Sequence, residues 1–125
     1  MDNNNKDLPL MGGLLTGPTF LADADVARCM TYRDAVRLAW AKRRSMGMSQ
    51  STLAERCGLY ASHVTDYLNA RDADAHGRTR RSLPAEKISI FEATVGNRAI
   101  TQFLIRQAQL TCMEEIIAQR AQRAA

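Results

Sequence analysis

Residues 50–69 read QSTLAERCGLYASHVTDYLN, and this stretch decides the fold. Apolar residues recur at helical spacing in its first half and again in its second half, with a glycine between them. Gly58 stands where the chain must turn, because glycine takes a positive φ without the steric cost of a Cβ. Ala54 is small where two helices must approach closely. The pattern predicts a helix-turn-helix, an arrangement that reads DNA in the major groove.

Signals for the ends of helices continue on both sides of this stretch. Thr31 and Ser49 are suited to N-caps, and Gly96 is suited to end a helix. Thr111 and Glu114 have the spacing of a capping box, which predicts a separate last helix. The predicted helices cover about residues 32–46, 50–57, 61–70, 84–95, 97–110 and 111–125.

No segment alternates apolar and polar residues as a strand does, so the predicted fold class is all-α. We expect a poorly ordered, flexible leader over residues 1–30, because this segment is polar at its start and then interrupted by glycine and proline. A DNA-binding domain is predicted over residues 31–110, and a short C-terminal helix over 111–125 with a dimer contact. Met30 precedes the first good helix start, which raises the hypothesis of translation from Met30.

The net charge of +4 is unevenly distributed. Residues 33–81 contain ten basic and five acidic side chains, whereas residues 1–32 contain two basic and four acidic ones. Positive charge around the predicted motif favours a polyanion partner, and a solvated arginine-rich surface is the alternative.

The remaining composition excludes other classes of protein. The three cysteines fit neither a metal site nor a disulfide framework, and no apolar run approaches the roughly 20 residues of a membrane helix. No secretory signal is apparent. We therefore expect a cytoplasmic, nucleoid-associated protein with reduced thiols and no membrane partner.

The order of residues from Ser49 onward resembles the lambda-repressor and Cro family of DNA-binding domains, also called XRE-like. In that family a Ser-Gln pair opens the second helix, an alanine follows four residues later, and a glycine four after that. Gln50, Ala54, Gly58 and then Val64 match, and the resemblance covers roughly residues 31–110. It implies a five-helix domain, here with an extra C-terminal helix. It also implies a phage-type repressor that binds a palindromic operator as a homodimer.

The resemblance places the third helix in the major groove. The base-reading residues would be Tyr60, Ala61, Ser62, His63, Thr65, Asp66 and Asn69, whereas Val64, Tyr67 and Leu68 would face the core. Hydroxyl, amide, imidazole and carboxylate groups suit base edges. Alternatives remain open for four of them: Ser62 as the helix cap, Asp66 paired with an arginine, His63 solvated, and Tyr60 packed over the turn.

The expected phosphate contacts are Gln50, Arg43, Arg44, Arg78, Arg80 and Arg81. In the family the glutamine bonds a phosphate at the N-terminus of its helix, where free N–H groups favour anions. Arg43 and Arg44 either contact the DNA backbone or complement the dipole of the first helix. The other three arginines lie in the polar loop over residues 71–83, where they clamp phosphate or reach a minor groove.

An enzyme is not expected, because the sequence has no phosphate-cradling glycine loop, HExxH motif or metal-spaced cluster. No catalytic residue, metal or cofactor is therefore predicted. The alternative function is a protein-interaction module on the same fold, such as an antitoxin with a protein partner. The residues suggested for dimerisation are Phe103, Leu104, Ile116 and Ile117, and the alternative is that these residues pack within their own domain.

Overall fold

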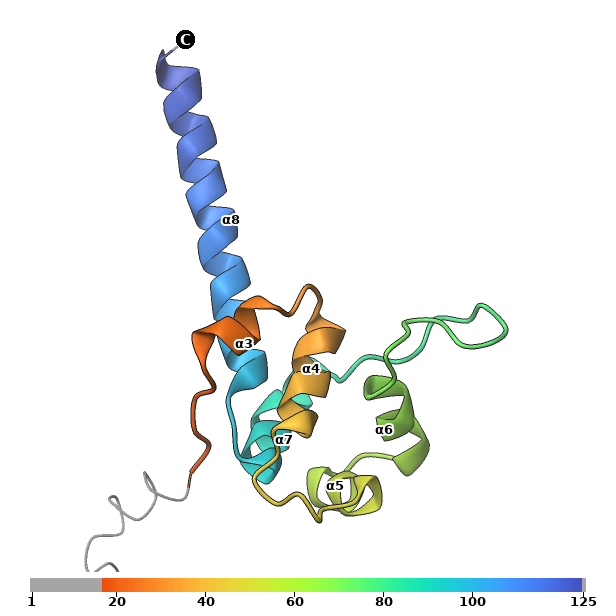
Figure 1. The fold of residues 1–125 in the computed structure, drawn as a ribbon. Coiled ribbons are helices and arrows are strands. Elements are labelled where there is room, and N and C mark those ends of the chain that lie inside the picture. The colour runs from red at the N-terminus through yellow and green to blue at the C-terminus, as the bar shows by residue number, and fades with distance from the viewer. Residues whose placement is uncertain (1–16, 125) are drawn as a thin grey trace, which may run out of the picture.

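The structure is a computed structural model that describes residues 17–124 of the chain. Over this range it contains helices and no strand, which confirms the all-α class. The α-helices are α3 (Asp23–Ala27), α4 (Tyr32–Ala41), α5 (Gln50–Cys57), α6 (Ala61–Tyr67), α7 (Ile88–Val95) and α8 (Ala99–Ala124), and a 3-10 turn, η1 (Ala85–Lys87), precedes α7. Figure 1 shows a cluster of short helices from which α8 projects.

The motif predicted from residues 50–69 has the expected local structure. Ser49 accepts a hydrogen bond from the Thr52 amide and caps α5, as its position indicated. Gly58 has φ of 67°, and the Leu59 amide donates to the Ala54 carbonyl over 2.8 Å, which closes the end of α5. The positive φ favours glycine at residue 58, and the Nζ atom of Lys87 lies 3.3 Å from where a Cβ would be, so a side chain there would have to displace it slightly.

The core lies between α4, α5, α6, α7 and the start of α8. Its fully buried side chains include Leu53, Phe91 and Ile100. Val64 and Tyr67 are buried and Leu68 packs against the same cluster, so the predicted inner face of α6 is confirmed. Burial of each large apolar side chain contributes about 1.5–3 kcal/mol to stability, which fixes α6 firmly on the domain.

Helix α4 is shorter than the predicted span of residues 32–46. It begins as expected, because Thr31 and Asp34 form a reciprocal capping box. It ends at Ala41, five residues early, because the chain then turns toward α7, where the Arg44 amide donates to the Val95 carbonyl over 2.7 Å. The helical propensity of residues 42–46 favours a longer helix. The hydrogen bond between Arg44 and Val95 competes with the backbone bonds that would extend α4.

The prediction of a poorly ordered leader is wrong for residues 17–30. The Thr19 amide donates to the Gly96 carbonyl, and the Leu21 amide and carbonyl both bond the side chain of Gln102. Helix α3 follows, and Val26 is buried in a small cluster with Phe103. Residues 1–16 lie outside the described range, so the prediction stays untested there.

The predicted break at Thr111 is also wrong, because α8 is one continuous helix of 26 residues. Thr111 lies in its interior, and residues 98–124 contain no glycine or proline that would interrupt it. Its first turn is held from two sides. The Asn97 carboxamide accepts from the Ala99 amide, and the buried Glu92 carboxylate accepts from the Thr101 amide over 2.8 Å.

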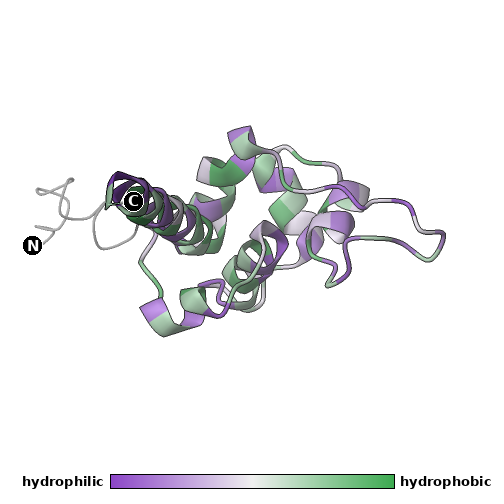
Figure 2. Ribbon diagram, turned by 90° about the horizontal axis from the view of Figure 1, so that it is seen from above, coloured by the Kyte–Doolittle hydropathy of each residue, from purple (hydrophilic) through white to green (hydrophobic). Residues whose placement is uncertain are grey.

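From residue 104 to the end of the described range, every side chain of α8 is exposed. Figure 2 looks along this helix and shows hydrophobic and hydrophilic residues mixed on it. In both views the loop over residues 71–83 projects on the opposite side of the molecule from α8. No helix within residues 17–124 is long and apolar enough to cross a membrane.

Candidate nucleic-acid interface

The outer face of α6 presents short polar and small side chains. Ala61, Ser62 and Thr65 are all exposed. Tyr60 occupies the N-cap position, so Ser62 is the second helical residue and its interpretation as the cap is wrong. The Thr65 hydroxyl donates to the Ala61 carbonyl over 3.3 Å and still has its lone pairs as acceptors. This face therefore offers hydroxyl groups close to the helix backbone.

Three aromatic rings meet edge to face where the turn joins α6. The ring of His63 lies 5.0 Å from that of Tyr60 and 6.4 Å from that of Tyr67. His63 is half-buried by these contacts, and Tyr60 remains 74% exposed. The Tyr60 ring thus contacts His63 on α6 and still presents most of its surface to a partner.

Asp66 is engaged by two arginines from the following loop. Its carboxylate accepts from Arg80 over 3.2 Å and from Arg81 over 3.1 Å. Partial burial raises the pKa of Asp66, but the hydrogen bonds and charges of Arg81 and Arg80 outweigh it and hold that pKa below its usual value. The carboxylate therefore holds the loop against α6, which makes it a poor acceptor for a base.

Asn69 is half-buried, and its side-chain carbonyl accepts from the Arg71 amide over 3.0 Å. This contact starts the chain into the loop after α6. A bidentate contact of Asn69 with adenine would use the same carbonyl as an acceptor, so this contact and the base-reading role predicted for Asn69 compete.

A buried arginine that sequence reasoning missed ties α4 to α6. The Arg33 guanidinium donates to the main-chain carbonyls of Asp66, Tyr67, Asn69, Arg80 and Arg81. Those carbonyls lie at the end of α6 and at the end of the loop, and a cation there is favoured by the helix dipole. Arg37 adds a bond to the Leu68 carbonyl over 3.3 Å. The signal was a basic residue on the apolar side of a helix, beside buried Val36.

The loop over residues 71–83 contains a short hairpin over residues 72–80, closed by one isolated bridge, which we call the ribbon. The Arg80 amide donates to the Asp72 carbonyl over 2.8 Å, and Ala73 and Thr79 form an antiparallel bridge. Gly77 has φ of 80° at the tip. We predicted only a polar loop here. Asp74 followed by Gly77 three residues later is the turn signal that would have revealed the ribbon.

The predicted phosphate contacts divide into two groups in space. Gln50 is the exposed first residue of α5, and Arg78 is exposed on the ribbon. The side chains of Arg80 and Arg81 are 20% and 60% exposed, and Asp66 engages both. These four lie on or next to the helix-turn-helix.

Arg43 and Arg44 lie at the other end of α4 and contact protein groups. The Arg43 guanidinium stacks over Trp40 at 4.0 Å and donates to the Trp40 and Met46 carbonyls. Arg44 donates to the Gly17 and Gly96 carbonyls. Arg43 thus bonds a carbonyl at the end of α4, as the structural alternative requires, whereas Arg44 bonds the Gly96 carbonyl at the end of α7 and does not bond α4.

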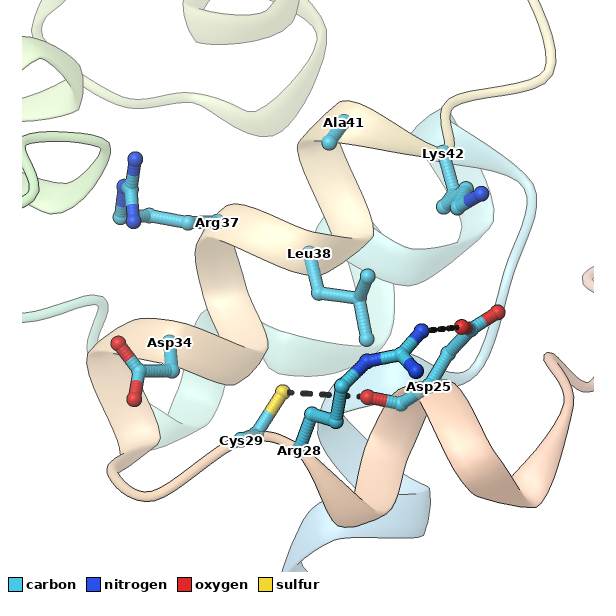
Figure 3. Close-up of a pocket in the computed structure, with 8 residues that line it drawn as sticks. All are labelled: Asp25, Arg28, Cys29, Asp34, Arg37, Leu38, Ala41 and Lys42. Atoms are coloured by element: carbon cyan, nitrogen blue, oxygen red, sulfur yellow. Dashed lines mark hydrogen bonds and ion pairs between the residues drawn. The ribbon is translucent and has the colours of Figure 1, made fainter.

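A separate open hollow lies between α3 and α4 (Figure 3). Its lining consists of Asp25, Arg28, Cys29, Asp34, Arg37, Leu38, Ala41 and Lys42. Arg28 pairs with Asp25, and the Cys29 thiol points to the Asp25 carbonyl. Burial raises the pKa of Cys29, and the negative charge of Asp34 raises it further, so the thiol is protonated at neutral pH. These groups supply no activated nucleophile.

Within residues 17–124 no three metal-ligating side chains of the His, Cys, Asp or Glu types gather into a metal site. Comparisons of the chain with protein-family models, curated proteins and solved structures found no match. The exposed groups of α5, α6 and the ribbon therefore offer the chemistry from which a function can be inferred.

Proposed function

We propose that this protein is a sequence-specific DNA-binding regulator of transcription, with α6 in the major groove. The observation that carries the proposal is the exposed face of α6, where Ser62 and Thr65 lie on a helix whose other face is fixed in the core. Short hydroxyl side chains allow the helix backbone to approach base edges closely and can donate or accept there. The tight turn at Gly58 and the cap at Ser49 support the same interpretation.

The charge around α6 supports binding to a polyanion. Arg78 and the partly exposed Arg81 lie beyond the C-terminal end of α6, and Gln50 opens α5. We propose that α4, α5, α6, α7 and the first part of α8 are the five helices of a lambda-repressor-like domain. Such a protein would act on the nucleoid in the cytoplasm, and repression of a palindromic operator is the mode of action that we propose.

We further propose that two copies assemble through α8. Beyond residue 104 its exposed large hydrophobic side chains are Ile105, Leu110, Met113, Ile116 and Ile117. Because helices in proteins gain most of their stability by packing an apolar face, the exposed part of α8 beyond residue 104 suits a partner. Leu110, Met113 and Ile117 follow the three-and-four spacing of a helix seam. A palindromic site requires two recognition helices, so a second copy fits this seam.

Fluorescence anisotropy with a random DNA duplex at several salt concentrations tests the proposal. If a dimer contacts about six phosphates, the logarithm of affinity should fall with the logarithm of salt at a slope near −5. Absence of salt-sensitive duplex binding by the full chain would contradict the DNA function.

Two substitutions then test the assignment of α6. A cognate site is first selected from a pool of random duplexes. Ser62→Leu and Thr65→Leu should weaken binding to this site by at least tenfold, equivalent to about 1.4 kcal/mol, with a much smaller change on random DNA. Ser89→Leu, an exposed serine on α7, is the matched control. Equal losses on both duplexes would contradict the register of the recognition helix.

The exposed seam of α8 also favours a second candidate function, a protein-interaction module such as an antitoxin. In that case the seam binds a different protein. A full chain that stays monomeric at high concentration and does not bind duplex DNA would favour this alternative.

A further inference from the structure

Hydrogen bonds within the chain hold the tip of the ribbon in one conformation without a ligand. The Asp74 carboxylate accepts from the His76 and Arg78 amides, each over 2.9 Å. The Gly77 amide donates to the Asp74 carbonyl over 3.0 Å, and the Asp74 amide donates to the Arg78 carbonyl over 2.9 Å. This arrangement is a turn followed by a left-handed glycine, the three-residue hairpin loop that suits twisted strands.

The base of the ribbon is fixed to the end of α6. Arg80 and Arg81 reach back to the Asp66 carboxylate on α6. Arg33, from α4, bonds the carbonyls of both of these residues and also those at the end of α6. The orientation of the ribbon is therefore set relative to α6 from two directions.

The projecting part of the ribbon presents cationic side chains to solvent. Arg71 and Arg78 are exposed, and among the described residues no side chain pairs with either guanidinium. Asp74 lies nearby, but its carboxylate is used by the turn amides. The paired part is short, because hydrogen bonds join residues 72–74 to residues 78–80 and the turn follows directly.

We infer that the ribbon is a second DNA-binding element, which contacts the sugar-phosphate backbone at the edge of the groove that α6 occupies. Arg78 binds a phosphate directly, and Arg71 adds charge at the base of the ribbon. Phosphate contacts of this kind set the register of a protein on the duplex and carry no sequence information themselves. The inference deepens the DNA-binding proposal and depends on it.

The first experiment measures the salt dependence of duplex binding for the full chain and for Arg78→Ala. We expect Arg78→Ala to reduce the magnitude of the slope by about 0.9 for each copy bound. It should also remove the outermost protected phosphates from a hydroxyl-radical footprint, while the protection due to α6 remains. Arg123→Ala, a change of the same charge near the end of α8, is the matched control and should leave both unchanged.

A second pair of variants distinguishes a ribbon with a fixed conformation from a flexible loop that contributes only charge. Asp74→Asn keeps an acceptor for the turn amides, whereas Asp74→Ala removes it, and both lose the same negative charge. A charged loop without fixed shape predicts the same gain in affinity for both. The shaped ribbon predicts that Asp74→Ala binds at least threefold more weakly than Asp74→Asn. Circular dichroism melts of each variant establish that the helical domain is folded.

The outcomes distinguish this inference from the function on which it depends. If the wild type binds DNA and Arg78→Ala behaves like Arg123→Ala, the ribbon inference is overturned and the role of α6 stands. Equal affinity of the two Asp74 variants would overturn the fixed shape of the ribbon. If the wild type shows no salt-sensitive binding, both the function and the inference fail.

Discussion

Two charged side chains are buried within residues 17–124, Arg33 and Glu92, and both bond main-chain groups. Arg33 is buried without a carboxylate beside it and is satisfied by carbonyls alone. Glu92 is fully buried and accepts from the amide and hydroxyl of Thr101 and from Arg98. A buried charge is costly unless every polar group around it is paired, so each of these side chains fixes the geometry of the segments that it joins.

Glu92 is expected to be a large contributor to stability. Glu92→Ala leaves Arg98 and the first turn of α8 without their acceptor and should lower the free energy of unfolding by about 3 kcal/mol. Glu92→Gln keeps one acceptor and should lose less. Urea denaturation measures both, with the exposed Glu115→Ala as the control. A loss below about 1 kcal/mol for the alanine variant would contradict the role assigned to the carboxylate.

The contact of Asp66 with its two arginines predicts a dependence on pH. Because the pKa of Asp66 is lowered in the folded protein, its contribution to stability is complete above the unfolded pKa of about 3.9. The contribution is lost as pH falls through the lower folded value. Wild type should therefore exceed Asp66→Asn in free energy of unfolding at about pH 6, and the difference should vanish in acid. A difference that stays constant with pH would contradict the ion pairs.

At the scale of the element, local signals predicted local structure well. Helix α5, its cap at Ser49 and its end at Gly58 follow from residues within one turn of each boundary, and the sequence predicted all three. The early end of α4 could not be predicted in this way, because it accompanies a bond between Arg44 and Val95, which are far apart in the chain. The continuity of α8 could have been predicted, because residues 98–124 contain no glycine or proline, but the capping-box spacing of Thr111 and Glu114 favoured a break.

The candidate site shows the same division. The inward positions of α6 follow from helical periodicity, so Val64 and Tyr67 were predicted correctly. The pairing of each arginine with a carboxylate depends on the path of the loop over residues 71–83. The sequence left the pairing of Asp66 open for that reason, and it gave no indication of the carbonyls that Arg33 binds.

Helix α3 is expected to be part of the folded domain. Val26 is buried against Phe103, so Val26→Ala should lower the free energy of unfolding by about 1–2 kcal/mol. A chain that begins at Met30 loses α3 entirely and should lose more. Thermal denaturation measures both changes, with the exposed Ala24→Ser as control. Equal stability of the shortened chain would contradict the role of α3 in the folded domain.

For the whole molecule, the exposed seam of α8 predicts a concentration-dependent assembly. Ile117→Asp places a charge in the seam and should shift the protein from dimer to monomer in sedimentation equilibrium, with little change in helix content. Gln119→Asp, an exposed position toward the opposite side of α8, is the control. A wild type that is monomeric at every concentration would contradict the seam as a contact between copies.

The continuity of α8 has a consequence for distance. Asn97 and Glu92 fix the base of this helix to the domain, and the helix has no joint along its length. If two copies meet on it, the number of residues between the base of α8 and the seam sets the distance between their recognition helices. One residue inserted between the base and the seam would move the partner by about 1.5 Å and rotate it by about 100°. Insertions of seven residues, close to two full turns, would lengthen the span while nearly restoring the angle. In such a dimer the length of α8 would set the distance between the two half-sites.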